Sequence, residues 1–451
     1  MSNRIIQLIL LLSAFAQANY VEPFKSNPYI ACSEASHCPK EWPCCSQYGQ
    51  CGSGPLCISG CNPKFSHSPE SCVPVPALLP QLEIVASDDK GVYLEMSGQP
   101  AMVTRFQPKS SAQLLEVHHE EQKYGVSALE RDLNSRGLIH FPDYMITSKP
   151  EVAKEMLEQY DFIHSGFISV DSDSDGLVLG MPKKTTGSLI SSSKVFLYGR
   201  AAVTMKTSRG PGVITAIVFM SSTQDEIDYE FVGSELHTVQ TNYYYQGELN
   251  HSRMRRHSLP SNSHEEYHIY EVDWDAERIH WMVDGEIVRT LYKRDTWDPV
   301  QKIYKYPQTP MMLQISLWPA GTPDAPQGTI EWAGGLIDWE NAPDIKRFGQ
   351  LSAQIQRVAI TPYNNEFCPE IHETMGQWGA QNSEEEPFRV AYGYESNNGH
   401  FDPKKLKWYT DARLHLSSWH ATGLHPTAAQ KQQHHRRSLP HVEAPPTTNT
   451  T

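Results

Sequence analysis

The chain has 451 residues, a formal net charge of -14 and a pI near 5.8. No basic stretch stands out before the C-terminal tail, so nucleic acid is excluded as the expected partner. The length gives room for about three domains and a large core. Ten Trp and twenty-one Tyr residues suit stacking on sugar rings as well as packing in a β-sheet core.

Residues 1–18 have the order of a secretory signal peptide. Arg4 precedes an apolar run at 5–12, and Ala16-Gln17-Ala18 follows, so cleavage is expected before Asn19. The apolar run is too short to cross a bilayer. We therefore expect a secreted protein without a transmembrane segment, in a compartment where disulfides can form.

Eight of the nine cysteines lie within residues 32–72, which predicts a small module stabilised by disulfides. A zinc site is the alternative, but the adjacent Cys44 and Cys45 and the absence of a Cys-x-x-Cys pair argue against it. The spacing alone leaves the pairing open. The ninth cysteine, Cys368, has no evident partner and is expected to be a free thiol or to form an intermolecular bond.

The run at 44–52 resembles the hevein-type chitin-binding module. The resemblance implies that the Ser46 hydroxyl and the Tyr48 ring bind N-acetylglucosamine. Two positions that usually carry aromatic rings hold Gln50 and Leu56 instead, so weaker binding of chitin is expected, and a purely structural module is the alternative. The resemblance also implies four disulfides: Cys32–Cys45, Cys38–Cys51, Cys44–Cys57 and Cys61–Cys72.

Residues 74–145 are expected to be a linker and lead-in that follows the module at 19–73. The stretch that begins with Val73-Pro74-Val75-Pro76 and ends at Pro80 predicts a stiff, extended spacer. Further on, residues 128–133 are compatible with a helix. We assign no function to residues 81–145.

Short runs of alternating apolar and polar residues recur from residue 166 onward, with turn residues between them. This pattern predicts an all-β jelly-roll sandwich over 146–362 and not βαβ units. The pair Asp284-Gly285 predicts a tight hairpin. Strands are expected at 176–181, 195–206, 212–220, 225–230, 237–245, 279–281, 287–291 and 312–318.

The strand at 225–230 reads Asp-Glu-Ile-Asp-Tyr-Glu. Residues two apart in a strand point to the same side, so Glu226, Asp228 and Glu230 share one face. The solvated outer face of an edge strand is the alternative interpretation. Three close carboxylates repel one another, which raises the pKa of at least one of them. Glycosidic chemistry uses that asymmetry, because one carboxyl attacks while charged and its neighbour donates a proton.

This strand resembles the Glu-x-Asp-x-Glu active-site strand of glycoside hydrolase family 16. Its setting at 222–233, together with the runs at 315–321 and 328–335, resembles the fungal chitin-glucan transglycosylases of the Congo-red-hypersensitive type. The resemblance extends over residues from about 160 to 362. It implies a family 16 jelly roll and a secreted enzyme that cleaves chitin with retention and transfers it to β-glucan or chitin.

The resemblance also implies the roles of single residues. Glu226 is expected to be the nucleophile, Glu230 the proton donor and acid/base, and Asp228 the residue that assists them. Substrate-binding positions fall on Glu230, Gln314, Trp318 and Thr329. No cofactor and no metal are expected. A β-glucan or chitin hydrolase on the same fold and a non-catalytic, chitin-binding wall lectin are the alternatives.

Two segments imitate metal sites. The acidic run at 171–176 has the start of a calcium loop, but its twelfth position is Pro182 and not the required Glu, so we expect a hairpin turn. His264 to His268 fits the His-Glu-x-x-His zinc pattern, which works only on a helix, whereas the period here is two and predicts a strand. Asn250 and Asn449 are candidate N-glycosylation sites.

Residues 363–451 are expected to be a C-terminal extension that is disordered after about residue 425. Many members of the family end in an apolar tail for a lipid anchor, whereas this sequence ends in Pro-Thr-Thr-Asn-Thr-Thr, so no anchor signal is expected. In this respect the chain is similar to the unanchored, sporulation-associated yeast member. The expected location is therefore the fungal cell wall, and within it the spore wall.

Overall fold

The computed structural model describes most of the module, most of the sandwich and part of the C-terminal extension. Several predictions lie outside the described residues: the signal peptide at 1–18, the acidic run at 171–175, Cys368, Asn449 and the tail after 425. The described residues are 25–57, 60–72, 74–80, 82–88, 91–96, 102–105, 129–132, 138–140, 162–170, 176–367, 391–395 and 399–409.

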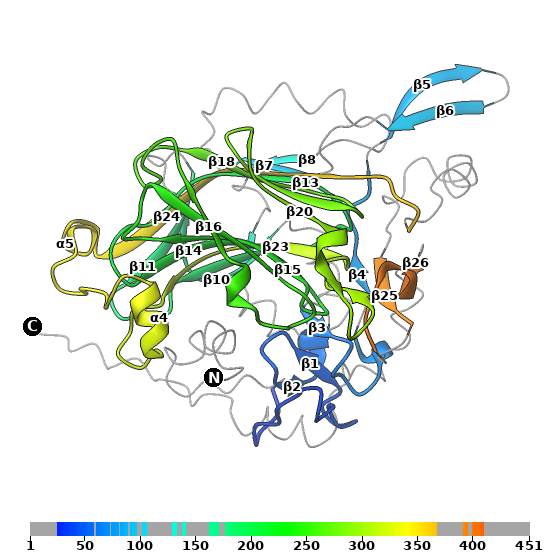
Figure 1. Cartoon of the computed structure of the whole chain (residues 1–451), viewed down its shortest axis with the longest axis horizontal. Coiled ribbons are helices and arrows are strands. Elements are labelled where there is room, and N and C mark those ends of the chain that lie inside the picture. Colours follow the sequence, from blue (N-terminus) through cyan, green and yellow to red (C-terminus); the bar gives the residue numbers. More distant parts are fainter. Residues whose placement is uncertain are drawn as a thin grey trace, which may run out of the picture.

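A two-layer, mainly antiparallel β-sandwich forms the largest part of the fold (Figure 1). The prediction of an all-β jelly roll is confirmed. The first layer contains, in spatial order, β17 (Arg255–Ser258), β16 (Thr238–Tyr244), β15 (Glu226–Val232), β14 (Val213–Ser221), β23 (Met311–Pro319), β12 (Ser188–Ser192) and β10 (Phe162–Val170). The second layer contains β10 again, β11 (Leu177–Pro182), β24 (Gln350–Pro362), β13 (Gly199–Lys206), β18 (His268–Trp274), β19 (Arg278–Val283) and β20 (Glu286–Tyr292).

Strand β10 joins the two layers. Its first half pairs with β12 in one layer and its second half with β11 in the other. Gly166 lies at the changeover with a φ of 80°, and a Cβ there would come within 2.1 Å of the Gly187 carbonyl oxygen. Only glycine combines that backbone conformation with so close an approach.

The core between the layers fixes which way β15 faces. Ile227, Tyr229 and Phe231 are at most 2% exposed and belong to this core. The Tyr229 hydroxyl donates to the Glu271 carbonyl at 2.6 Å and accepts from the Met282 amide at 2.8 Å, and both partners lie in the second layer. Because the strand alternates, Glu226, Asp228 and Glu230 face away from the second layer.

Two local predictions are confirmed in the second layer. Asp284 and Gly285 have φ of 51° and 85° and join β19 to β20 as a two-residue hairpin of left-handed residues. His268 begins β18 and does not lie on a helix with His264. Its Nδ1 atom lies 2.7 Å from Asp284 Oδ2, and its Nε2 atom lies 3.0 Å from Ser261 Oγ.

The lead-in region carries strands. The prediction of a helix at 128–133 is wrong, because β8 (Leu129–Asp132) lies there and pairs in parallel with β7 (Met102–Arg105). In turn, β7 extends β24, and β9 (Leu138–His140) pairs with β10. Pairing with distant strands overrides a weak local preference. A separate hairpin consists of β5 (Leu82–Asp88) and β6 (Gly91–Met96).

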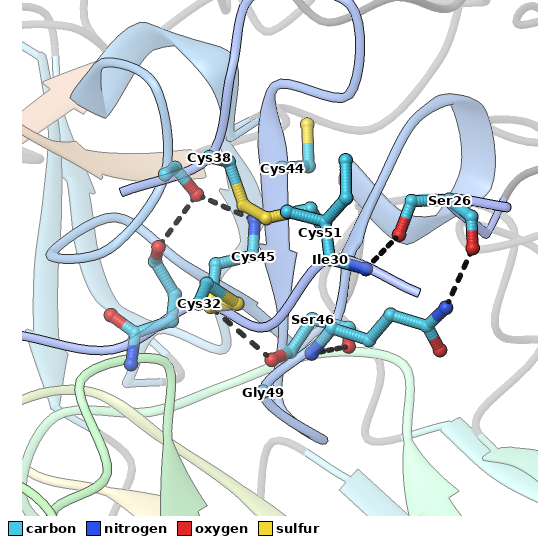
Figure 2. The surroundings of a disulfide bond; sticks show 12 residues. Ser26, Ile30, Cys32, Cys38, Cys44, Cys45, Ser46, Gly49 and Cys51 are labelled. Carbon is cyan, nitrogen blue, oxygen red and sulfur yellow. Dashed lines mark hydrogen bonds between the residues drawn. A yellow bond between two sulfur atoms is a disulfide. The ribbon is translucent and has the colours of Figure 1, made fainter. Parts of the chain in front are cut away.

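The N-terminal module has the small sheet β1 (Cys44–Ser46), β2 (Cys51–Gly52) and β3 (Cys61–Asn62) and two 3-10 turns, η2 (Gly54–Cys57) and η3 (Pro69–Ser71). Figure 2 shows the Cys38–Cys51 disulfide, with Cys32 and Cys45 beside it. The cysteines themselves form most of the buried interior. The disulfides are the four that the resemblance implies: Cys32–Cys45, Cys38–Cys51, Cys44–Cys57 and Cys61–Cys72.

The C-terminal extension connects the module to the sandwich. Its strand β25 (Ala391–Tyr394) pairs with β26 (Leu406–Tyr409) and with β4 (Val75–Pro76). The predicted Val-Pro spacer is therefore held in a sheet, because its backbone finds a partner more than 300 residues away in the sequence. Figure 1 shows β4, β25 and β26 grouped together beside the module strands β1–β3.

Short elements complete the fold. They are the helices α4 (Gln327–Trp332) and α5 (Pro343–Phe348), the hairpin β21 (Trp297–Asp298) and β22 (Ile303–Tyr304), and the turns η5 (His251–Arg253), η6 (Lys293–Thr296) and η7 (Pro403–Lys405). Within the described part of the chain, every helix is too short or too polar to cross a membrane.

Candidate active site

The side of the first layer that faces away from the second layer carries the three predicted carboxyl groups. Residues directly opposite each other in antiparallel strands point to the same side, so the register identifies their neighbours. On β16, Tyr244 lies opposite Glu226, Asn242 opposite Asp228, and Gln240 opposite Glu230. On β23, reached through β14, the same side holds Gln314 and Trp318. We call this surface the carboxylate face: Glu226, Asp228, Glu230, Gln240, Asn242, Tyr244, Gln314 and Trp318.

Accessibility differs along the row of carboxyl groups. Glu226 and Glu230 are half-buried, whereas Asp228 between them is 2% exposed. On an extended strand the Cα atoms of the two glutamates are about 13 Å apart. The long glutamate side chains can lean towards each other, so both carboxyl groups can reach one bound sugar from opposite ends. The alternative of a solvated edge strand is wrong, because β15 lies between β14 and β16.

Burial raises the pKa of all three groups. It raises the pKa of Glu230 to about 8, with the charge of Asp228 as the second cause. The pKa of Glu226 is also raised well above its ordinary value, first by burial and then by the charges of Asp228 and Glu230. Since each charge opposes its neighbours, a proton on one glutamate favours ionisation of the other. The row can thus hold one protonated and one charged glutamate at neutral pH.

Asp228 has the most mixed surroundings. Burial raises its pKa to about 7, while the charge of Arg289 and the backbone amide of Asn242 oppose the rise. On the core side, the Trp281 indole nitrogen donates to the Asp228 carbonyl at 3.1 Å and fixes the strand beneath the carboxyl group. A carboxyl group so placed can bias the charges of both glutamates without being exposed itself.

Several buried polar atoms at the carboxylate face have no hydrogen-bond partner among the residues that the structure describes. They are Asp228 Oδ1, Gln240 Nε2, Asn242 Oδ1 and, on helix α4 beside this face, Thr329 Oγ1. Buried polar groups in folded proteins are nearly always paired, so four such atoms at and beside one face indicate a site for a polar ligand. A sugar, with hydroxyl groups that both donate and accept, matches this mixture of donors and acceptors.

Two tryptophans border the row at the Glu230 end. Trp318 is only 7% exposed and its ring centroid lies 6.2 Å from that of Trp332, with an angle of 29° between the planes. The Trp332 indole nitrogen donates to Gln240 Oε1 at 2.9 Å, and this ring is the more exposed of the two. Sequence reasoning singled out Trp318 and Thr329 but missed Trp332, although the same short segment carries it.

Asp225 is acidic but does not belong to the row. Its carboxyl group is fully buried and accepts from the backbone amides of Gln246 and Gln308 and from the Thr309 hydroxyl. Burial raises its pKa to about 7. These bonds join three loops at the start of β15, so the carboxyl group stabilises the position of Glu226 in the chain.

The module contributes one residue to the carboxylate face that the sequence did not reveal. Gln314 Nε2 donates to Gln47 Oε1 of the module at 3.4 Å and to Ser191 Oγ at 3.2 Å. The predicted chitin-binding residues flank Gln47: Ser46 is 3% exposed and Tyr48 is half-buried. The candidate glycan site, Asn250, is exposed, and its side chain accepts from the Ser252 amide and hydroxyl.

A cavity of about 290 Å³ lies elsewhere, between the loops around β22 and the C-terminal extension. Aromatic rings line much of it, including Tyr245, Tyr304 and Phe401. None of the three carboxyl groups of the row contributes to its walls. The row therefore lies outside this cavity.

Comparisons with known proteins show the family of the chain. The sequence model described as "Glycosyl hydrolases family 16" matches residues 156–334, which include the carboxylate face. "Probable glycosidase CRR1" of Eremothecium gossypii is 94% identical over 450 residues and covers 100% of both chains. The Saccharomyces cerevisiae protein of the same name is 43% identical over 407 residues, which is 88% of this chain and 94% of that protein.

A third relative carries another name. "Crh-like protein UTR2" of Candida albicans is 36% identical over 395 residues, which is 88% of this chain and 70% of that protein. These matches extend beyond the sandwich into the module and the extension. The chain therefore belongs to the glycosyl hydrolases of family 16, in the branch whose members include the Crh-like proteins.

Proposed function

We propose that this protein is a retaining transglycosylase that cleaves chitin chains and transfers them to β-glucan or chitin acceptors in the fungal cell wall. The observation that carries the proposal is the row of three carboxyl groups on one sheet face, bordered by buried polar atoms that have no hydrogen-bond partner among the described residues. Two glutamates with raised pKa and an aspartate between them supply what a double displacement at a sugar carbon needs.

In the first step, a carboxylate oxygen of Glu226 forms a bond to the anomeric carbon of a β-1,4-linked N-acetylglucosamine chain. The glycosidic carbon–oxygen bond breaks, and its electron pair goes to the leaving oxygen, which takes the proton from Glu230. The pKa of about 8 keeps that proton on Glu230 at neutral pH. With the proton on Glu230, one of the two charges that oppose ionisation of Glu226 is removed, so Glu226 is the glutamate that we assign the negative charge.

In the second step, Glu230 accepts the proton of an incoming sugar hydroxyl. The oxygen of that hydroxyl bonds to the anomeric carbon and Glu226 leaves, so the configuration is retained. Transfer exceeds hydrolysis only if an acceptor sugar occupies the place where water would attack. The paired rings of Trp318 and Trp332 and the hydroxyl of Thr329 are the residues that we propose for holding it.

The remaining assignments are proposals of the same kind. We assign chitin binding to the module at 19–73 through Ser46 and Tyr48, catalysis to 146–362 and N-glycosylation to Asn250. We also propose that the protein is secreted and acts in the cell wall, in particular in the spore wall. The four disulfides of the module suit an oxidising compartment.

A transfer assay tests the proposal against its rivals. Purified protein is incubated with chitin and fluorescent β-glucan oligosaccharides, and the products are separated by size. Labelled polymer supports a transferase, shortened oligosaccharides indicate a hydrolase, and bound but unchanged sugar indicates a lectin. NMR of the first-formed product shows whether the β configuration is retained.

Variants of the row test the roles of its residues. Glu226→Gln and Glu230→Gln are each expected to lower the transfer rate by about 10²–10⁴-fold, because each removes a group that acts on the reacting atoms. Glu286→Gln, an exposed carboxylate on the β19–β20 hairpin, is the matched control and should keep the wild-type rate. A Glu230→Gln variant that still makes labelled polymer at the wild-type rate would reject the acid/base assignment.

A further inference from the structure

A side chain of the module makes a hydrogen bond to the carboxylate face. Gln47 follows strand β1, and its Oε1 accepts a long hydrogen bond of 3.4 Å from Gln314 Nε2. Gln314 lies in the same cross-strand row as Asp228, with Val218 of β14 between them. Two strand spacings amount to about 10 Å, so Gln47 reaches the sheet at that distance to the side of the carboxyl row.

The path of Gln47 is fixed within the module. Its side chain lies across Gly60, where a Cβ would come 3.0 Å from Gln47 Oε1. Gly60 also has a φ of 67°, a conformation that suits glycine. The side-chain amide of Gln47 is therefore packed against Gly60 on one side and bonded to Gln314 of the sheet on the other.

The module is also firmly seated. Its residues Cys61, Pro63 and Cys72 line a small cavity of about 10 Å³, roughly the room of one water. The facing wall includes Ser222, in the turn between β14 and β15, four residues before Glu226. On the other side, β4 is paired with β25. The module is thus packed against the start of the carboxyl-bearing strand.

We propose that Gln47 is a positioning residue for the transferred polysaccharide, and that the module extends the carboxylate face into one binding surface for a single chain. The inference rests on the proposed function and adds a selection for chain length to it. Two carboxamides side by side offer donors and acceptors that suit the acetamido and hydroxyl groups of an N-acetylhexosamine polymer. A chain that crosses the strands over the carboxyl row reaches this pair.

The geometry favours an extension over a lid. Glu226 and Glu230 keep part of their surface exposed although the module is docked. The contact of Gln47 is with Gln314, two strands from β15, and not with a carboxyl group of the row. A lid would cover the reacting groups themselves.

A binding experiment tests the inference without turnover. In the full-length Glu230→Gln protein, the affinity for chitin oligosaccharides of increasing length is measured by calorimetry, with and without Gln47→Ala. Gln47→Ala is expected to weaken binding about threefold to tenfold for long oligosaccharides and to leave short ones unchanged, the range that one lost hydrogen bond gives. Gln301→Ala, an exposed glutamine in the β21–β22 hairpin, is the matched control.

Turnover supplies the second measurement. In the active protein, Gln47→Ala should lower kcat/KM for long donors by the same factor and leave kcat/KM for short donors at the wild-type value. The double variant Gln47→Ala with Gln314→Ala should lower kcat/KM for long donors by less than the product of the two single effects. An equal loss at every length, no loss, or a faster reaction would overturn the inference. Since length-dependent binding needs no catalysis, absence of transfer in the wild type would reject only the proposed function.

Discussion

The module and the sandwich reach a stable fold by different means. In the module, two clusters of buried cysteines form the interior, with only a few partly buried apolar side chains against them. In the sandwich, one continuous core contains large buried rings such as Trp274, Trp281 and Tyr306. A segment of about forty residues buries too little apolar surface to fold without such bonds, whereas the sandwich buries enough.

This difference explains where acidic groups can be placed. The carboxyl groups of β15 and Asp225 all have raised pKa because the surrounding protein opposes their charge. Only a fold with a large core can carry that destabilisation. The module, by contrast, presents uncharged groups such as Gln47 to the sheet.

The largest effect should follow from breaking a disulfide. Replacing Cys38 and Cys51 together by Ser is expected to cost the module about 2–5 kcal/mol and to unfold it, while the sandwich keeps its core. Differential scanning calorimetry should show the loss of one transition with the main transition nearly in place, and retention on chitin should fall. If the thermal transition of the sandwich shifted as much as that of the module, the two regions would not be stabilised independently.

A smaller effect is expected from Glu230→Gln, measured as stability against pH. The pKa of Glu230 rises from 4.5 in its ordinary state to about 8 in the folded protein. Between these values the folded chain holds a proton that the unfolded chain has released, so the free energy of unfolding falls as pH rises. The variant removes this loss and should be more stable by about 1–2 kcal/mol above pH 8.

The pH profile supplies the control for that measurement. Well below pH 4.5 both the folded and the unfolded form hold the proton of Glu230, so the stabilities of Glu230→Gln and wild type should converge there. Transfer by the wild type should decline as pH rises through about 8, because the proton donor is lost. A variant that is less stable than wild type at high pH would contradict the raised pKa.

The smallest effect concerns the hydrogen bonds that join the C-terminal extension to the sandwich. Gln246 donates to the Phe401 carbonyl at 2.6 Å and accepts from the Phe401 amide at 3.2 Å. Gln246→Ala removes both hydrogen bonds to the backbone of Phe401 and should lower the free energy of unfolding by only about 0.5–1 kcal/mol, because the loss is local to the extension. Hydrogen exchange should rise in β25 and β26 and remain at the wild-type level in β15. An equal increase of hydrogen exchange in β25, β26 and β15 would contradict a local role of these hydrogen bonds.

Much of the sandwich could be predicted because its signals are local. Alternation along β15 orients Glu226, Asp228 and Glu230, and the Asp284-Gly285 pair specifies its hairpin through residues that accept positive φ. The cysteine spacing likewise predicts a disulfide-bonded module. Each of these features depends on residues close together in the sequence.

What could not be predicted depends on pairing between distant segments. Val75 and Pro76 carry no local sign that β25 will pair with them, and Leu129–Asp132 pair as a strand with the distant β7. The approach of Gln47 to Gln314 joins residues 267 positions apart. Trp332 could have been found, since its segment was already identified, but its bond to Gln240 depends on how helix α4 returns to the sheet.

The pairing of β4 with β25 also sets an order of events during biosynthesis. β4 is synthesised early, whereas β25 and Phe401, which binds Gln246, are synthesised only after every strand of the sandwich. Until then, the N-terminal module is joined to the sandwich through the chain but lacks the pairing of β4 with β25. The contacts of the C-terminal extension with β4 and with Gln246 can therefore form only late in synthesis.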